Sequence, residues 1–101
     1  MQDRVLSMVG LAAKAGKVVS GEFSVEKAVK EKKAYMVIIA DDASDNTKKM
    51  FTNMCTFYHV PIYFYADKER LGRAIGKEMR ASVGITDAGL GNTILKKLNN
   101  E

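Results

Sequence analysis

Residues 35–40 read YMVIIA, an unbroken apolar run with three adjacent β-branched residues. Successive side chains of a strand point to opposite faces of its sheet, so a run without polar residues predicts a strand that is buried on both faces. Such a strand needs helices above and below it. This stretch therefore predicts the central strand of a layered α/β fold, and the segments around it supply the other elements.

Before this strand, the pattern predicts a helix, a short strand and a second helix. The first helix ends near Gly16 and has these apolar residues at helical spacing: Val5, Met8, Val9, Ala12 and Ala13. Residues 17–20 (KVVS) form a short strand that breaks at Gly21. In the second helix, Val25, Ala28, Val29 and Lys32 share one face, while Lys27, Lys30 and Lys33 lie toward another.

After the polar loop at residues 41–46, helices and strands continue to alternate. A third helix is predicted from the series Thr47, Met50, Phe51, Met54, Cys55 and Tyr58. A strand at 62–65 precedes a short helix that begins after its cap, Asp67, and ends at Gly76. The inner face of this helix consists of Leu71, Ala74 and Ile75. A last strand covers 81–86, and Asp87 caps a final helix whose Leu90, Ile94, Leu95 and Leu98 face the core. This order predicts a single domain, residues 1–101, built as an α-β-α sandwich.

Composition narrows the class of protein. The 101 residues include 16 Lys and Arg against 12 Asp and Glu, a net charge of +4, which favours an anionic partner with nucleic acid first. No apolar stretch approaches the roughly 20 residues of a membrane-spanning helix. The first residues, Met1 and Gln2 included, lack the pattern of a secretion signal, and Cys55 is the single cysteine. We expect a cytoplasmic protein without a membrane partner, and a monomer because the core faces account for the apolar stripes.

The junction at Gly21 is the most informative local feature. Glycine allows close backbone approach, and the first turn of a helix presents free N–H groups with partial positive charge, which suits a phosphate. Lys17 precedes the junction, Ser20 is expected to cap the second helix, and Lys27 projects from that helix about two turns into it. Alternatively, Gly21 only ends a strand and the lysines form a solvated face. The physical argument leaves both interpretations open.

Two other patterns suggest a nucleotide site and a metal site. Gly10 and Gly16 superficially resemble a phosphate-binding P-loop, but five residues separate them where four are needed, and Val18 replaces the required Ser or Thr. The pair Asp41-Asp42 could hold Mg²⁺, yet no third carboxylate or partner lysine is evident. We interpret this pair as a solvated turn, followed by a helix cap at Ser44 or Asp45.

Cys55 and His59 lie four residues apart, a spacing that would allow a thiolate–imidazole pair or half of a metal site. The chain has no second Cys or His to complete such a site. Cys55 fits the apolar face of the third helix, so we interpret it as a core residue. With no catalytic constellation left, we expect neither an enzyme nor a bound metal or cofactor.

Residues 21–29 (GEFSVEKAV) resemble the Gly-x-Asn-Glu-x-x-Lys segment of the ribosomal protein L7Ae superfamily, whose members bind kink-turn RNA. Residues 60–63 (VPIY) and 71–77 (LGRAIGK) resemble the later signature of this superfamily. Together with KVVSGE at 17–22 and DAS at 42–44, the pattern is similar to the bacterial YlxQ-type branch. The resemblance covers nearly the whole chain.

This resemblance implies a three-layer α-β-α sandwich around a four-stranded mixed sheet. It implies a non-catalytic, ribosome-associated protein that binds a kink-turn-like ribosomal or regulatory RNA, with the ribosome as a further partner. The implied RNA-binding residues are Lys17, Ser20, Gly21, Glu22, Phe23, Ser24, Lys27, Arg80, Ala81 and Ser82. Of these, residues 22–24 would lie against sheared G·A pairs, Lys27 would contact a base edge or phosphate, and residues 80–82 would form a wall against the bulged nucleotide.

The chain departs from the superfamily pattern at Phe23 and Ser24, where kink-turn specialists commonly have Asn and Glu. A base-edge pairing is worth about 1–3 kcal/mol, so losing two costs on the order of tenfold to ten-thousandfold in specificity. Phe23 can stack on a base, or it can pack into the core as a hydrophobic staple. An alternative function is therefore a protein-interaction module that kept the fold, with Phe23 in an apolar contact patch.

Overall fold

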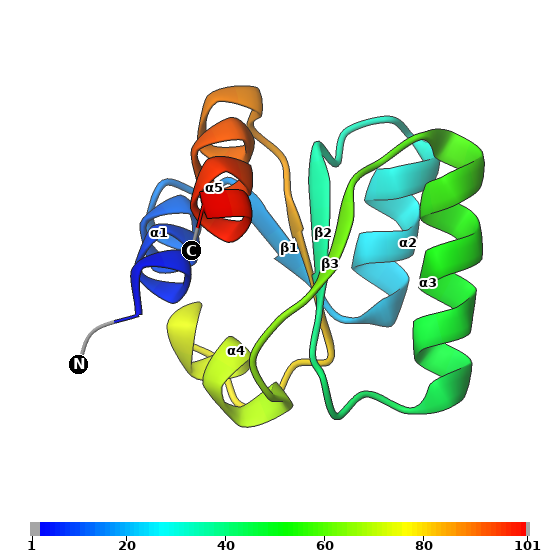
Figure 1. The fold of residues 1–101 in the computed structure, drawn as a ribbon, viewed down its shortest axis with the longest axis horizontal. Helices are drawn as coiled ribbons and strands as arrows, with labels where there is room; N and C mark the ends of the chain where they lie inside the picture. Colours follow the sequence, from blue (N-terminus) through cyan, green and yellow to red (C-terminus); the bar gives the residue numbers. More distant parts are fainter. Residues whose placement is uncertain (1–2, 101) are drawn as a thin grey trace.

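Helices and strands alternate along the chain in the computed structural model, which describes residues 3–100 (Figure 1). The helices are α1 (Arg4–Lys14), α2 (Glu22–Lys30), α3 (Asp45–Tyr58), α4 (Lys68–Ala74) and α5 (Ala88–Asn100). The strands are β1 (Val18–Ser20), β2 (Met36–Ile39), β3 (Ile62–Phe64) and β4 (Ser82–Ile85). The predicted order of elements is confirmed.

The four strands form one mixed sheet in the order β1-β4-β2-β3. β2 pairs with β3 in parallel and with β4 in antiparallel orientation, and β1 pairs with β4 in antiparallel orientation. The register places Ser20 opposite Val83 and Val37 opposite both Gly84 and Ile62. The strand that comes last in the chain thus lies inside the sheet, and β1 lies at its edge.

The sheet separates two helical layers, with α1, α4 and α5 on one face and α2 and α3 on the other (Figure 1). β2 shows how the sequence produces this division: Met36 and Ile38 pack in the first layer's core, and Val37 and Ile39 in the second. All four side chains are fully buried. The predicted central strand and the three-layer α-β-α sandwich are confirmed.

The end of α2 differs from its prediction. The helix stops at Lys30. Lys32 lies beyond its end with a left-handed φ of 62°, and it is exposed and does not share the apolar face of α2. The N–H groups of Lys32 and Lys33 donate to the carbonyls of Val29 and Ala28, the hydrogen-bond pattern of a Schellman ending. This ending usually has glycine at the left-handed position, and the chain has Lys32 there. The periodicity of apolar residues therefore did not predict where the helix ends.

The start of the central strand also differs by one residue. Tyr35 precedes β2 and its side chain is 49% exposed, although its backbone N–H donates to the carbonyl of Ile85. None of the helices within residues 3–100 combines the length and the apolar character needed to cross a bilayer.

Candidate nucleic-acid interface

The chain passes from β1 into α2 through a single residue, Gly21, whose backbone angles are φ 91° and ψ 153°. Only glycine adopts this combination readily. The Gly21 N–H donates to the carbonyl of Ser82 at 3.1 Å, and its own carbonyl accepts the N–H of Val25 at 3.0 Å. Gly21 is thus the last residue tied to the sheet and the first that supports the helix.

α2 begins without a side-chain cap, unlike the other helices. Elsewhere a side chain accepts an N–H of the first turn, and the capping residues are Asp3 for α1, Ser44 for α3, Asp67 for α4 and Asp87 for α5. Within the described part of the chain, Gly21 leaves the N–H groups of residues 22–24 without a helical or capping acceptor. These groups carry the partial positive charge of the helix start.

Ser20 does not cap α2 as we expected. Its hydroxyl oxygen instead accepts the Nε–H of Arg80 at 3.2 Å. Arg80 is 60 residues further along the chain and comes close only because β1 pairs with β4. The expectation was wrong because a tertiary partner occupies the oxygen that a local cap would have used.

The loop before β4 is fixed by contacts to three segments. The Arg80 N–H donates to the carbonyl of Lys68 at 3.0 Å, and the Ala81 carbonyl accepts the N–H of Ala40 at 2.9 Å. Within the loop, Nη1 of Arg80 donates to the Met79 carbonyl at 2.9 Å. Arg80 therefore ties this loop to α4 through its backbone and to the end of β1 through its guanidinium.

Gly72 allows the same loop to approach α4. A Cβ atom at this position would overlap the carbonyl group of Glu78. Gly72 belongs to the LGRAIGK stretch at residues 71–77, so the structure gives that stretch a physical role: it seats the loop that carries Arg80 and Ala81.

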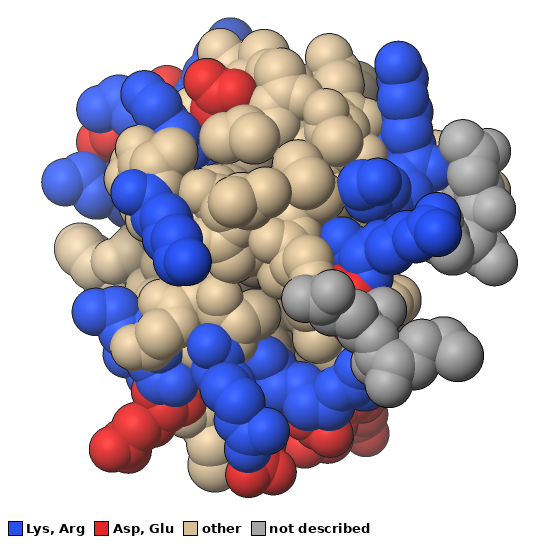
Figure 2. Space-filling model, turned by 90° about the vertical axis from the view of Figure 1, so that its left-hand side faces the viewer, with Lys and Arg blue, Asp and Glu red and all other residues tan. Residues whose placement is uncertain are grey.

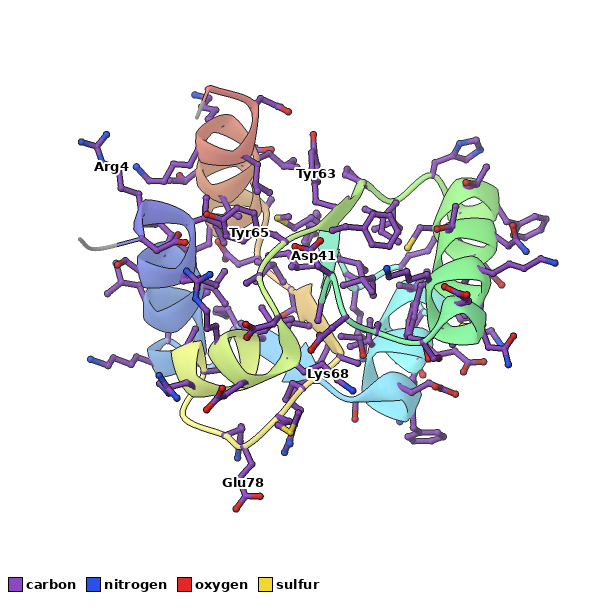
Figure 3. All side chains as sticks on the ribbon, turned by 60° about the horizontal axis from the view of Figure 1, so that its bottom comes forward. Arg4, Asp41, Tyr63, Tyr65, Lys68 and Glu78 are labelled. Carbon is purple, nitrogen blue, oxygen red and sulfur yellow. The ribbon has the colours of Figure 1, made fainter. Side chains whose placement is uncertain are left out.

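Asp42 does more than our interpretation of a solvated turn allowed. It is exposed, but its Oδ1 accepts the backbone N–H of Lys68 at 2.9 Å, which joins the loop after β2 to the start of α4. Figure 3 shows Asp41 and Lys68 near the middle of the view, and Glu78 pointing away from the body. The predicted cap at Ser44 is confirmed, with the Thr47 N–H at 3.1 Å.

Phe23 is 77% exposed, so the hydrophobic-staple interpretation is wrong. Its position on the first turn of α2 directs the ring to solvent, beside the exposed Glu22 and Ser24. Met79, which the sequence did not single out, is a second exposed apolar side chain at this edge. Its only signal in the sequence was its place between two charged residues, Glu78 and Arg80.

Two of the predicted site residues are less available. Ser82 is 1% exposed, so its side chain presents no surface to a ligand, and its carbonyl holds Gly21 instead. Lys17 is exposed at the opposite end of β1, about 13 Å along an extended chain from Gly21. The structure thus brings together the end of β1, the first turn of α2 and the loop before β4, but not Lys17.

Lys27 has an uncompensated charge next to this edge. Lys30 pairs with Glu26 at 2.8 Å and Lys33 with Glu31 at 3.4 Å, whereas Lys27 has no ion-pair partner within residues 3–100. More basic residues lie in α4 and the loop behind it: Lys68, Arg70, Arg73, Lys77 and Arg80. Figure 2 shows Lys and Arg gathered along the lower edge of the face that α1, α4 and α5 form.

Other candidate chemistry finds no support in the part of the chain that the structure describes. No group of three His, Cys, Asp or Glu residues between positions 3 and 100 is arranged to hold a metal ion. Cys55 is buried in the core between α2, α3 and the sheet, as predicted, and burial raises the pKa of its thiol to about 11. A thiol with this pKa is almost fully protonated at neutral pH and is a poor nucleophile or ligand.

Known proteins are similar to this chain in sequence and in fold. The chain is 42% identical to the RNA-binding protein YlxQ of Bacillus subtilis over 92 residues, which cover 91% of this chain and 92% of YlxQ. It is 30% identical to the large ribosomal subunit protein eL8 of Picrophilus torridus, covering 97% and 78% of the two chains. The solved structure of a Giardia lamblia 15.5kD RNA binding protein superposes with a TM-score of 0.82 at 26% identity, covering 99% and 89%.

The family model described as ribosomal protein L7Ae/L30e/S12e/Gadd45 matches residues 3–94, which include every segment of the edge described above. The resemblance inferred from residues 21–29 and 71–77 is thereby confirmed. The chain belongs to the ribosomal protein L7Ae/L30e/S12e/Gadd45 family.

Proposed function

We propose that this protein is a non-catalytic, ribosome-associated RNA-binding protein that recognises a kinked or bulged RNA. The binding edge consists of the end of β1, the first turn of α2 and the loop before β4. The observation that carries this proposal is the open start of α2, where Gly21 leaves three N–H groups uncapped beside the uncompensated charge of Lys27. The printed names of the relatives, an RNA-binding protein and a ribosomal protein, support it.

Each part of the edge has a role in this proposal. Apart from its two chain neighbours, no described residue lies within 4 Å of the position that a Cβ atom would take at Gly21, so an RNA backbone can approach there and accept from the N–H groups of α2. Lys27 contacts a phosphate or a base edge from the next turn of the helix. Arg80 and Ala81 form the wall against the bulged nucleotide, and Ser82 holds Gly21 from behind.

The RNA is read with fewer base-edge hydrogen bonds than in relatives with Asn and Glu at these positions. Phe23 has no hydrogen-bonding group, and Ser24 offers one short hydroxyl. Because the ring of Phe23 is exposed, it can stack on an unpaired base, a contact worth about 1–3 kcal/mol. We therefore expect recognition of RNA shape to outweigh recognition of RNA sequence.

The first experiment compares a kink-turn RNA with a straight duplex of the same length by fluorescence anisotropy at one salt concentration. Affinity for phosphates alone depends on salt and not on RNA shape, so tighter binding of the kink-turn is the expected result. Equal affinity for the two RNAs would reduce the activity to nonspecific phosphate binding.

A matched pair of variants locates the binding edge. Lys27→Ala should weaken kink-turn binding by about five- to a hundredfold, the effect of losing one contact of about 1–3 kcal/mol. Lys96→Ala removes another exposed lysine, from α5 in the other helical layer, and should change affinity much less. Similar losses in both variants would place the binding site elsewhere.

A protein-interaction module remains the second candidate, and the exposure of Phe23 is the observation that favours it. Affinity capture from nuclease-treated lysate separates the two functions. A protein partner that stays bound without RNA, and is lost with Phe23→Ala, would favour the second candidate. Complete loss of partners on nuclease treatment would favour RNA binding.

A further inference from the structure

An open groove of about 630 Å³ runs along α2, on the side that faces the edge strand β1. Val19 of β1 lines its floor, and α2 and its connection to β2 line its wall. The groove begins at Phe23 and Lys27, which belong to the RNA-binding edge proposed above, and continues to Tyr35. It therefore extends that edge away from Gly21, over a surface for which no role has been assigned.

Aromatic rings stand at both ends of this groove. Phe23 lies on the first turn of α2 and is 77% exposed, and Tyr35 follows the connection after the helix and is 49% exposed. From Phe23 to Lys30, the last residue of α2, the helix rises about 10 Å. Stacked nucleotides of one strand rise about 3.4 Å each, so this length is about three steps, the separation between the first and last of about four stacked nucleotides.

The charge between the two rings is positive. Lys27, Lys32 and Lys33 line the groove with a single carboxylate, Glu31, which is paired with Lys33 at 3.4 Å. Lys27 and Lys32 have no ion-pair partner among residues 3–100. The left-handed turn at Lys32 places the second of these free charges at the far end of α2, close in sequence to Tyr35.

We propose that this groove holds an unpaired RNA strand that continues from the bent RNA at Gly21. Bases at the two ends of the strand stack on Phe23 and Tyr35, and the intervening phosphates lie near Lys27 and Lys32. Exposed ring faces at both ends favour a nucleic acid over an acidic peptide, for which the lysines alone would suffice. This inference rests on the proposed function, because the strand enters the groove from the proposed RNA-binding edge.

The test uses three RNAs: a bent RNA with blunt ends, the same RNA with four unpaired nucleotides added to either strand, and the unpaired nucleotides alone. One of the two extensions should raise the affinity of the protein by about five- to a hundredfold, the effect of one stacked base. Tyr35→Ala should remove most of this gain and leave the affinity for the blunt RNA unchanged. Tyr35→Phe, which keeps a ring, should retain it.

Phe57→Ala is the matched control, because Phe57 is an exposed aromatic residue of α3 that does not line the groove. Thermal melts monitored by circular dichroism confirm that the variants are folded. The inference is overturned if neither extension raises affinity, or if Tyr35→Ala behaves like Phe57→Ala. It is also overturned if an acidic peptide displaces the extended RNA equally well from the wild type and from Tyr35→Ala.

Failure of the proposed function gives a different result. In that case the blunt bent RNA binds no better than a straight duplex, and Lys27→Ala has no larger effect than Lys96→Ala. Binding of the isolated unpaired nucleotides that depends on Tyr35 would still support the groove as a single-strand site. If the bent RNA is preferred and only the extension is ignored, the groove alone loses its assignment.

Discussion

Gly21 holds a backbone conformation that other residues adopt only at a cost. Its φ of 91° and ψ of 153° cost an L-residue about 1–3 kcal/mol, although nothing described within 4 Å would clash with a methyl group there. We expect Gly21→Ala to lower the free energy of unfolding by that amount in urea denaturation. Because the first turn of α2 would shift, kink-turn affinity should fall as well.

Gly16→Ala is the control for this substitution. Gly16 also has a positive φ, 73°, and open surroundings, but it lies at the end of α1. The Gly16→Ala protein should be less stable than the wild type, but its folded fraction should bind RNA with unchanged affinity. Equal affinity of the two alanine variants would show that the conformation at Gly21 serves only the fold.

At the scale of an element, Asp3 anchors the start of α1. Its Oδ1 accepts the Leu6 N–H at 2.9 Å, and its Oδ2 accepts from the Tyr65 hydroxyl at 2.8 Å and from Arg70 at 3.2 Å. Burial by itself would raise the pKa of Asp3, but these donors and the charge of Arg70 together lower it below 3.8. We expect Asp3→Ala to lower the free energy of unfolding at neutral pH by about 1–2 kcal/mol.

The lowered pKa also predicts how this contribution depends on pH. Asp3 stays charged to a lower pH in the folded protein than in the unfolded chain. Its contribution to the free energy of unfolding is therefore complete above the ordinary pKa and is lost as pH falls through the pKa of the folded state. Asp3→Asn keeps a capping oxygen and removes the charge. The difference in unfolding free energy between wild type and Asp3→Asn should therefore shrink below about pH 4. A constant difference would contradict this role of the charge.

Gly72 determines how α4 supports the loop before β4. A methyl group there would meet the Glu78 carbonyl, so Gly72→Ala must displace the loop before β4. We expect a loss of about 1–3 kcal/mol of stability and weaker RNA binding by the folded protein. Gly89→Ala, in the first turn of α5 and only in ordinary contact with Asp87, should change neither property appreciably. Unfolding curves and anisotropy titrations measure both effects.

At the scale of the whole molecule, the net charge of +4 favours an anionic partner. The number of RNA phosphates that the protein neutralises determines how its affinity for RNA responds to salt. The logarithm of affinity should fall linearly with the logarithm of salt concentration, with a slope of about 0.7–0.9 for each phosphate neutralised. If Lys27 contacts a phosphate, Lys27→Gln should reduce that slope by about one such step, and Lys96→Gln should not. An unchanged slope with reduced affinity would instead assign Lys27 to a base edge.

Local patterns in the sequence predicted the elements, and long-range contacts decided what the sequence could not predict. The buried strand within residues 36–39 and the caps Ser44, Asp67 and Asp87 depend on neighbouring residues, and all were confirmed. The partner of Ser20 is 60 residues away, and the exposure of Phe23 depends on which neighbours fail to cover it. The RNA contacts of the site residues stay predictions.

The position of β4 inside the sheet has a consequence for synthesis. β1 pairs only with β4 among the described strands, and β4 comes last of the four in the chain. Until residues 82–85 have been made, the sheet contains only the pair β2–β3, too few strands for independent stability. A chain whose translation has not reached β4 therefore lacks the proposed RNA-binding edge, and we expect RNA binding to begin only after the last strand has been made.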